Sequence, residues 1–191
     1  MDLQESILII GRTKVIMLQG EKIYLRPVRQ EDLPILAARA SDFTFLTEFN
    51  FFGLQQHNSL EKSFQQDGLL SQEHGTLVVV TCDHDQVVGD ISYRQVHYGP
   101  GTMSIAYNLG IALAPEHRGK GFGLEAQRLL ADYLFSVYPI MRIEASTDIT
   151  NSAELRALEK AGFTREGVLR KAQWRNGDWH DLVVFSKLRG E

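Results

Sequence analysis

The stretch "APEHRGKGFG" spans residues 114–123 and carries three glycines, at positions 119, 121 and 123, directly after Arg118. It follows the apolar run "LGIAL" (109–113) and precedes a segment whose apolar residues recur at helical spacing. Because glycine has no side chain, another group can lie directly against the backbone of this stretch. Because the first N–H groups of a helix have no partner and its dipole favours negative charge, this order predicts an anion-binding loop.

The segments around the loop predict a mixed α/β domain. Strands are expected over 22–28, 76–81, 86–94, 103–113, 142–147, 164–175 and 179–188, the last two joined by the turn residues "NGD". Helices are expected over 29–40, 57–70, 123–138 and 151–162, the last capped by Asn151 and stopped by Gly162. The phenylalanine-rich segment 41–56 has no clear assignment. The order is an antiparallel meander followed by a strand–helix–strand unit with the glycine loop at its centre.

Composition narrows the function classes. A chain of 191 residues with 43% hydrophobic and 23% charged residues fits one globular domain. The net charge of −4 argues against a nucleic-acid binder that neutralises phosphates over a broad surface. One cysteine, Cys82, makes no internal disulfide, and its strand-end position predicts a small buried side chain rather than a nucleophile. The histidines have no metal-ligand spacing, so we expect no metal. The apolar run "SILIIG" (6–11) is too short to span a membrane, so we expect a cytoplasmic protein.

Two well-known phosphate-binding loops do not fit the glycine stretch. The Walker loop needs G-x-x-x-x-G-K-[ST], which is absent. The dinucleotide fingerprint needs a parallel βαβ unit near the start of a domain, whereas the strands before residue 114 are predicted to be antiparallel. A different kind of phosphate ligand is therefore expected.

The spacing R-x-x-G-x-G is met by Arg118, Gly121 and Gly123, and two further motifs follow, "N…LEKAGF" (151–163) and "WRNGDWHD" (174–181). In this order they resemble the GNAT superfamily of acyl-CoA-dependent N-acetyltransferases, and within it the RimJ/RimL-type branch. The resemblance implies a central, mostly antiparallel sheet of about seven strands, flanked by helices and splayed between two central parallel strands. It runs from about Gly20 to Leu188, which suggests a domain over 19–191 after an extension over 1–18. Either Met17 is the true initiator, or the extension adds a strand at a dimer edge.

The resemblance also implies where acetyl-CoA binds. The phosphates would lie against the backbone amides of Gly119 to Leu124, and the pantetheine would pair with the strand before the loop, like an added strand. Asn151 would face the cofactor, although it is equally well explained as a helix cap. The implied cofactor-binding residues are Ile111, Ala112, Leu113, Arg118, Gly119, Lys120, Gly121, Phe122, Gly123, Leu124 and Asn151.

The catalytic residues are less clearly marked. The resemblance implies that a backbone N–H around Ile111 stabilises the oxyanion. The tyrosine that often protonates the leaving thiolate is replaced by Leu158, which leaves Asn151, Ser152 or a water as candidates. For the base we weigh Glu144 against three other candidates, Tyr107, Asn108 and Asp148, and Glu144 could instead be an ion-paired strand carboxylate. The predicted catalytic set is Glu144, Asn151 and Ile111.

The expected activity is direct transfer of an acetyl group from acetyl-CoA to a primary amine, either an N-terminal α-amine or an amine of a small molecule. One alternative is a non-catalytic acyl-CoA-binding module, which the missing tyrosine would favour. Another is a longer acyl donor such as succinyl-CoA, with Arg94 or Arg175 holding its carboxylate. No nucleic-acid or membrane partner is expected, and a homodimer is an open alternative.

Overall fold

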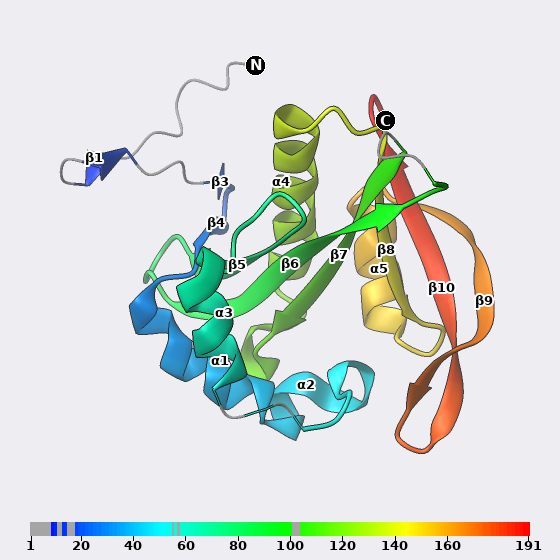
Figure 1. The fold of residues 1–191 in the computed structure, drawn as a ribbon, viewed down its shortest axis with the longest axis horizontal. Helices are drawn as coiled ribbons and strands as arrows, with labels where there is room; N and C mark the ends of the chain where they lie inside the picture. Colours follow the sequence, from blue (N-terminus) through cyan, green and yellow to red (C-terminus); the bar gives the residue numbers. More distant parts are fainter. Residues whose placement is uncertain (1–8, 11–12, 15–17, 55, 57, 101–103) are drawn as a thin grey trace.

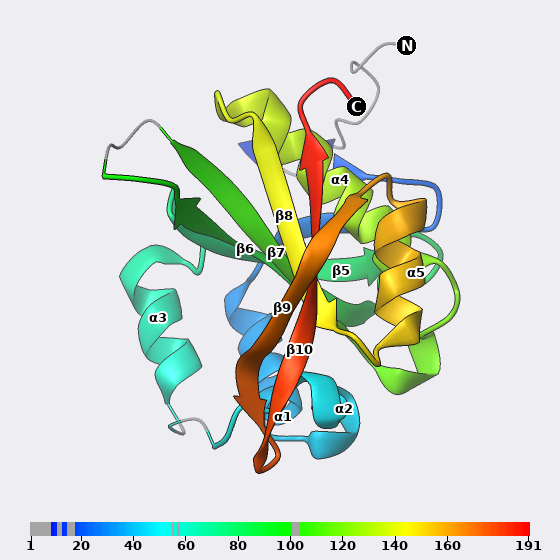
Figure 2. The same cartoon turned by 90° about the vertical axis from the view of Figure 1, so that its right-hand side faces the viewer.

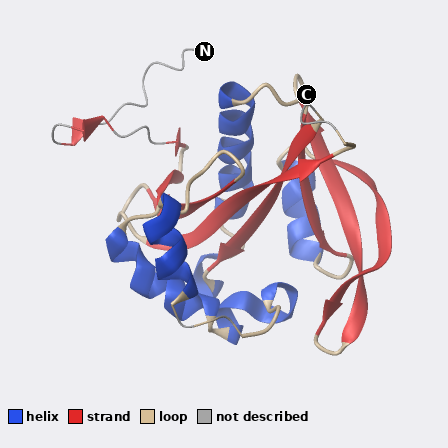
Figure 3. Cartoon of the chain, in the orientation of Figure 1, coloured by secondary structure: helices blue, strands red, loops and turns tan. Residues whose placement is uncertain are grey.

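The computed structural model describes residues 9–10, 13–14, 18–54, 56, 58–100 and 104–191. Its main feature is one sheet of eight strands in the order β3-β4-β5-β6-β7-β8-β10-β9 (Figure 3). The strands of this sheet are β3 (Leu18–Gln19), β4 (Ile23–Pro27), β5 (His74–Thr81), β6 (Val87–His97), β7 (Ile105–Leu113), β8 (Arg142–Asp148), β9 (Thr164–Arg175) and β10 (Asp178–Leu188). Seven of them were expected, and the short β3 is the addition. A separate pair is formed by β1 (Ile9–Ile10) and β2 (Thr13–Lys14).

The helices flank the sheet on two faces (Figures 1 and 2). Three of them follow β4, namely α1 (Leu33–Ala40, after the 3-10 turn Gln30–Asp32), α2 (Phe43–Asn50) and α3 (Ser59–Asp67). The other two are α4 (Phe122–Val137, after the 3-10 turn Pro115–His117) and α5 (Ser152–Lys160). The segment without a clear sequence assignment therefore contains α2. The remaining expected helices and strands are confirmed to within a few residues at their ends.

Strand alternation explains the two layers. In β5, Leu77 and Val79 belong to the core under α4, whereas Val78 and Val80 belong to a second core. This second core also contains Val28, just after β4, and Leu33 and Leu36 of α1. Both faces of β5 are thus buried, which is why it reads as a continuous apolar run.

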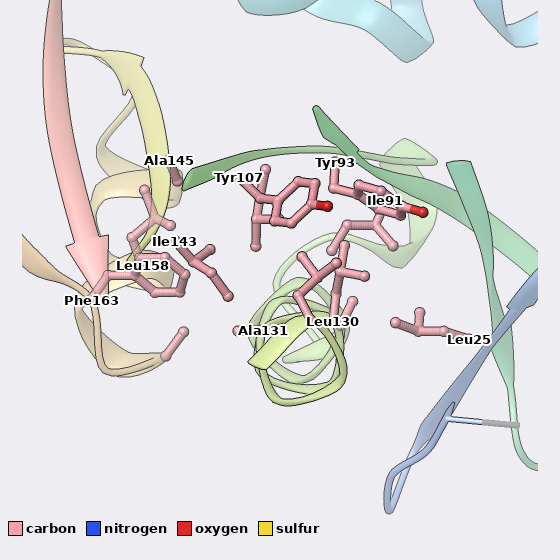
Figure 4. Close-up of a cluster of buried hydrophobic side chains, with 14 of the residues drawn as sticks. Leu25, Ile91, Tyr93, Tyr107, Leu130, Ala131, Ile143, Ala145, Leu158 and Phe163 are labelled. Carbon is pink, nitrogen blue, oxygen red and sulfur yellow. The ribbon is translucent and has the colours of Figure 1, made fainter. Parts of the chain in front are cut away.

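Helix α4 occupies the centre of the larger core (Figure 4). Its buried residues are Ala126, Gln127, Leu130, Ala131 and Leu134, which form one face at helical spacing. Gln127 is the polar member of this face and is only 1% exposed. The helix is thereby held rigidly against the sheet, and its N-terminus is fixed at the end of β7.

The parallel pair β7 and β8 parts after a short contact. The two strands pair only from Tyr107 opposite Ile143 to Leu109 opposite Ala145. Past that point β7 continues along β6 as far as Leu113, while β8 continues along β10 as far as Asp148. In Figure 1 the two strands diverge toward α2. The splay that the family resemblance implied is confirmed.

The C-terminal hairpin has the turn that its sequence predicts. Asn176 and Gly177 both have positive φ, 50° and 82°, between the paired residues Arg175 and Asp178. Two left-handed central residues match the twist of the flanking strands. Gly162, just past α5, also has φ of 87°, as expected of a helix stop.

Two expectations concern the N-terminus and the membrane. Residues 1–8, 11–12 and 15–17, with Met17 among them, lie outside the described part of the chain, so the boundary between 18 and 19 stays a prediction. Among the described residues, no helix combines the length and apolar character needed to cross a membrane.

Cys82 is exposed, so the expectation of a small buried side chain is wrong.

Candidate active site

A cavity of about 590 Å³ lies between the parted strands, the glycine loop, α5 and α2. Nine of the residues that the sequence assigned to the cofactor line it, namely Ile111, Ala112, Leu113, Arg118, Gly119, Gly121, Gly123, Leu124 and Asn151. The side chains of Lys120 and Phe122 lie outside this wall, since Lys120 is exposed and Phe122 packs beside the core. The sequence did not single out Thr47, Asn50, Gln127, Ser146, Thr147 and Glu154, which also line it.

The glycine loop has the geometry of an anion cradle. Gly119 and Gly121 have φ of 73° and 89°, and Gly121 is the N-cap of α4. The first helical hydrogen bond runs from Glu125 N to Gly121 O, at 3.1 Å, so the amides of residues 122–124 precede the helix ladder. A side chain at Gly123 would meet Leu113 Cδ1 at 3.5 Å, inside the cavity wall. The residues present therefore fit a phosphate group.

The edge of β7 that faces the splay is an unpaired strand edge. Ala114 N donates to Val88 O at 2.8 Å, which fixes the side on which β7 pairs with β6. Because amides alternate sides along a strand, the N–H groups of Ile111 and Leu113 point toward the splay. No described strand pairs with them there, since the contact with β8 ends at Leu109. An extended arm with amide groups fits this edge, as the pantetheine of coenzyme A has.

Arg118 supports the loop rather than projecting freely into the cavity. Its Nε donates to Leu113 O at 2.9 Å, and its Nη2 donates to Phe45 O on α2. Burial lowers the pKa of its guanidinium. The motif arginine thus connects the end of β7, the glycine loop and α2.

Helix α2 is broken where it meets the cavity. Thr47 has φ of 60° and ψ of −177°, a conformation that a β-branched residue rarely adopts. The carbonyls on both sides of the break are held by arginines, Phe45 O by Arg118 and Glu48 O by Arg175. The break turns Thr47 and Phe49 toward the cavity, which both residues line.

Arg175 reaches α2 from a buried charge cluster. Its guanidinium is 1% exposed and also bonds the carboxylate of Asp148, at the end of β8. His180 Nδ1 lies 2.9 Å from the same carboxylate. Burial alone would raise the pKa of Asp148, but the hydrogen bonds from Thr150 and the charges of Arg175 and His180 outweigh it and lower the pKa. Arg175 is therefore committed to Asp148, which argues against its binding a succinyl carboxylate.

Asn151 caps α5, as the sequence predicted. Its Oδ1 accepts from Glu154 N at 3.3 Å, and its Nδ2 donates to Thr147 Oγ1 at 3.1 Å. The second N–H of the same amide group remains for a ligand in the cavity that Asn151 lines. The capping role is confirmed, and the contact with the cofactor stays a prediction.

A second cavity, of about 400 Å³, lies near the splay on the sheet face away from α4. Ser146 lines both cavities, so they adjoin at the point where β7 and β8 part. The other residues around the second cavity are Tyr98, Asn108, Arg142, Glu144, Glu166, Gly167, Val168, Leu169 and Val184. We refer to it as the acidic groove, because two carboxylates and one guanidinium line it.

Glu144 is buried in this acidic groove, not in the cavity of the glycine loop. Its Oε1 accepts hydrogen bonds from the hydroxyl of Tyr98 and from Arg142 Nε. Arg142 also bonds Glu166, and this bond and that of Ser186 lower the pKa of Glu166 to about 2. No hydrogen bond from the described residues falls on Glu144 Oε2. The ion-paired carboxylate that the sequence left open as an alternative is confirmed, whereas the role of Glu144 as a base stays a prediction.

The other candidate catalytic positions separate clearly. Tyr107 is completely buried in the core and its hydroxyl donates to Gln72 O, so it faces neither of the two cavities. Asp148 is occupied by Arg175, whereas Asn108 lines the acidic groove. Leu158 is 1% exposed and packs near Ile143 in the core (Figure 4).

Gln127 and Glu154 are two of the polar residues of the first cavity that sequence reasoning missed, and they bond each other. Gln127 Nε2 donates to Glu154 Oε1 at 2.6 Å. Glu154 reads in the sequence as an ordinary acid in the first turn of a capped helix. The available signal was Gln127, a polar residue on the apolar face of the helix expected over 123–138.

The glycine loop, the unpaired edge of β7 and the cavity between them together define an acyl-CoA-binding protein. Residues 22–164 match the acetyltransferase (GNAT) domain, and the chain belongs to this family of N-acetyltransferases. Its acyl donor is acetyl-CoA.

Individual relatives agree with this assignment. The probable N-acetyltransferase YjcK of Bacillus subtilis is 32% identical and covers 90% of this chain and 97% of its own length. The fold is shared with RimL, a ribosomal L7/L12 alpha-N-protein acetyltransferase, in complex with coenzyme A, with a TM-score of 0.76, 18% identity and coverage of 90% and 97%. It is also shared with spermidine N-acetyltransferase from Vibrio cholerae in complex with CoA and spermine, with a TM-score of 0.77, 20% identity and coverage of 89% and 97%.

The first prediction tests the phosphate cradle. Gly123→Val should weaken binding of coenzyme A by at least about tenfold, or about 1.4 kcal/mol, because its methyl groups would cover the amides at the helix start. The fold should survive, since the added Cβ makes only ordinary contacts, at 3.5 and 3.8 Å, and Gly123 does not have a positive φ. Calorimetry with coenzyme A measures the change.

Gly167→Val is the matched control, because Gly167 lies in β9 beside the acidic groove and has open space around its Cβ position. It should leave affinity for coenzyme A unchanged. Gly121 is less suitable, since its φ of 89° strains any side chain whatever the ligand does. Wild-type affinity in a folded Gly123→Val variant would contradict the cradle.

The second prediction tests the buried cluster that holds α2. Arg175→Met should lower the free energy of unfolding by about 3–5 kcal/mol, because within the described chain it leaves the buried Asp148 with Thr150 as hydrogen-bond donor and only His180 as a possible cation. Adding Asp148→Asn should recover part of the loss. Urea unfolding of the single and double variants measures both effects.

The same variants have a defined pH dependence. The pKa of Asp148 is lowered by folding, so its contribution is complete above the ordinary carboxyl pKa of about 4 and is lost as pH falls through the lower folded value. The stability of Arg175→Met should therefore depend less steeply on pH below about 4 than that of the wild type. Equal slopes would show that Arg175 does not set this pKa.

Proposed function

We propose that this enzyme transfers the acetyl group of acetyl-CoA to the α-amine of a peptide or protein N-terminus, or to a similarly weakly basic amine of a small molecule. The observation that carries the proposal is the meeting of two cavities at Ser146, one on each side of the sheet. The donor enters along the glycine loop and β7, and the amine enters through the acidic groove. The two reactants then meet where β7 and β8 part.

Acetyl-CoA supplies an acetyl thioester, which is already activated toward an amine. The chain positions it through the amides of residues 119–124 at the phosphates and the free edge of β7 along the arm. Asn151 adds its free N–H at the N-terminus of α5. The N–H of Ile111, which points into the splay, lies where it can stabilise negative charge on the carbonyl oxygen.

Glu144 is the proposed base on the amine side. Its Oε1 is held by Tyr98 and Arg142, which fix the carboxylate at the wall of the groove. Its Oε2 is free of hydrogen bonds from the described residues and can accept a proton from the attacking amine, directly or through a water. Tyr98 and Arg142 are positioning residues in this proposal.

Simple acid–base arithmetic favours an α-amine. With a pKa of about 7.7–8.0, roughly a tenth of an α-amine is neutral at pH 7, whereas a lysine amine at about 10.4 is neutral in about one molecule in two or three thousand. The gap is about 2.5 units, or roughly 3.5 kcal/mol, which a strong base or a desolvating pocket would have to supply for lysine. The groove offers one oxygen of an arginine-bonded carboxylate for this work. RimL, which shares the fold, is an alpha-N-protein acetyltransferase, which supports the same acceptor class.

Several finer points stay predictions. The cytoplasmic location, a homodimer and the domain boundary near residue 19 are all such predictions.

The rival function, a non-catalytic module, was favoured only by the absence of the tyrosine at position 158. That position holds Leu158, which is buried in the core of this chain. Turnover of acetyl-CoA with an amine panel separates the enzyme from such a module.

The third prediction concerns the acceptor. Two peptides, identical except that one has a free α-amine with a blocked lysine and the other the reverse, are offered in competition with acetyl-CoA at pH 7. The α-amine should be acetylated faster, because far more of it is neutral. Mass spectrometry of the products measures the ratio, and spermidine serves as a third acceptor. Faster acetylation of the lysine peptide or of spermidine would overturn the α-amine proposal.

Glu144→Gln tests the base in the same assay. It keeps the shape and the hydrogen bonds at one oxygen but accepts no proton, so kcat should fall by about a hundredfold or more, within the usual range for a general base. Glu166→Gln is the control on the same groove, and we expect a much smaller effect because Arg142 and Ser186 occupy Glu166. Equal losses in both variants would indicate a shared structural role instead.

A further inference from the structure

The wall of the cofactor cavity contains a carboxyl group that the proposed function does not use. Glu154 lies on the first turn of α5, three residues after the cap Asn151, and it is half-buried. It lines the same cavity as Ile111 and Gly123, on the sheet face opposite to the acidic groove. Its carboxylate has one side-chain partner among the described residues, the amide of Gln127 on α4, at 2.6 Å.

Gln127 is an unusual residue for its place. It is 1% exposed on the core face of α4, and within the described chain its Oε1 has no hydrogen-bond partner. A buried polar atom without a partner costs on the order of 1–3 kcal/mol. An amide can be turned over so that its oxygen and its N–H exchange places. In one orientation Gln127 donates to a Glu154 carboxylate, and in the other its oxygen accepts the O–H of a Glu154 carboxylic acid.

We propose that Glu154 donates a proton to the sulfur as the acetyl group leaves coenzyme A, with Gln127 as its positioning residue. In this step the carbon–sulfur bond breaks, the sulfur keeps the electron pair, and it takes the proton from the Glu154 carboxyl group. The carboxylate left behind accepts a hydrogen bond from Gln127 Nε2. The nitrogen that forms the amide bond gives up its own proton to Glu144, and solvent later restores both side chains.

Burial favours the protonated form of Glu154, whereas the cations of the same cavity favour its carboxylate. Burial raises the pKa of Glu154, and the hydrogen bond of Gln127 opposes the shift in part. Arg118, Arg156 and Lys160 line the same cavity, whereas Arg128 of α4 bonds Lys160 O and Asp148 of β8 is bound to Arg175. A thiol with a pKa of about 8.5 binds a proton more tightly than a carboxylate does, so the transfer is downhill.

The geometry also separates the two proton transfers. Glu154 stands on the α5 side of the sheet, and Glu144 stands in the acidic groove on the other side. In this step the amine reaches the carbonyl carbon from the acidic groove, and the sulfur leaves on the side of α5. The proton donor and the proton acceptor therefore occupy different places. A tyrosine at position 158 is then not needed to supply the proton.

The first test needs no turnover. Acetyl-CoA is bound without an amine, and calorimetry in buffers of different ionisation enthalpy gives the number of protons taken up. Wild type should take up more protons near neutral pH than Glu154→Gln, because the ligand excludes water from Glu154 and raises its proton affinity. Glu159→Gln, on the exposed side of the same helix, is the matched control and should behave as wild type.

The second test uses the pH profile of kcat. We expect kcat of wild type to fall at high pH as Glu154 loses its proton. In Glu154→Gln this fall should vanish and kcat should be about tenfold to a hundredfold lower, at the low end for general acids because thiolates leave readily. Gln127→Leu removes the hydrogen bond that favours the carboxylate, so it should move the fall to higher pH.

The inference rests on the proposed function, and the outcomes tell the two apart. If the wild type turns over, and Glu154→Gln has the same kcat, pH profile and proton uptake as the wild type, the donor role alone is overturned. If Glu154→Gln instead loses a fall of kcat at low pH, Glu154 acts as a base, and the donor role is also overturned. An amine panel that gives no product with the wild-type enzyme overturns the proposed function and the donor role together. If Glu154→Gln does not fold, the shift in Gln127→Leu decides.

Discussion

The parting of β7 and β8 is the constraint on which the site depends. Parallel strands normally stay paired, because each unpaired buried amide costs free energy. Here the pairing ends at Leu109 and Ala145, while each strand remains bonded to its outer neighbour. The result is a strand edge inside the molecule whose hydrogen bonds are left for a ligand.

Holding such an opening requires supports on both sides. Helix α4 packs against the core and presents its N-terminus at the end of β7, so the positive end of its dipole and the glycine loop lie at the mouth of the opening. Arg118 and Arg175 tie α2 across it through two carbonyl groups, and they hold Thr47 in a strained conformation. Asp148 anchors Arg175 in turn, so the far ends of both strands are connected to the same helix.

Because the sheet is only one layer thick, the opening joins two environments. The side of α4 and α5 holds backbone amides, Asn151 and the Gln127–Glu154 pair. The opposite side holds Glu144, Tyr98, Arg142 and Glu166. Strand alternation produces this division: along β8, Ala145 faces the core while Glu144 and Ser146 face the groove. An anionic donor and an amine acceptor can therefore be bound by surfaces of different character and still meet.

The sequence alone determined the features that depend on neighbours along the chain. The glycine loop before α4, the cap Asn151, the Asn176–Gly177 turn and the mixed order of elements all follow from local backbone preferences and apolar periodicity. Glu144 faces away from Ile143 because side chains alternate along a strand, which is again a local rule. The family's motifs led to the splay and to nine residues of the cavity wall.

Only the tertiary structure decided which distant groups meet. Gln127 and Glu154, and likewise Asp148 and Arg175, are 27 residues apart in each pair, and no local pattern specifies such partners. The strained turn at Thr47 is imposed by arginines from two other segments, so its own sequence gave no sign of it. Cys82 was misjudged for the same reason, because burial depends on what packs over a strand end. Local preferences act over a few residues, whereas the packing that brings these charges together is a property of the whole sheet and its helices.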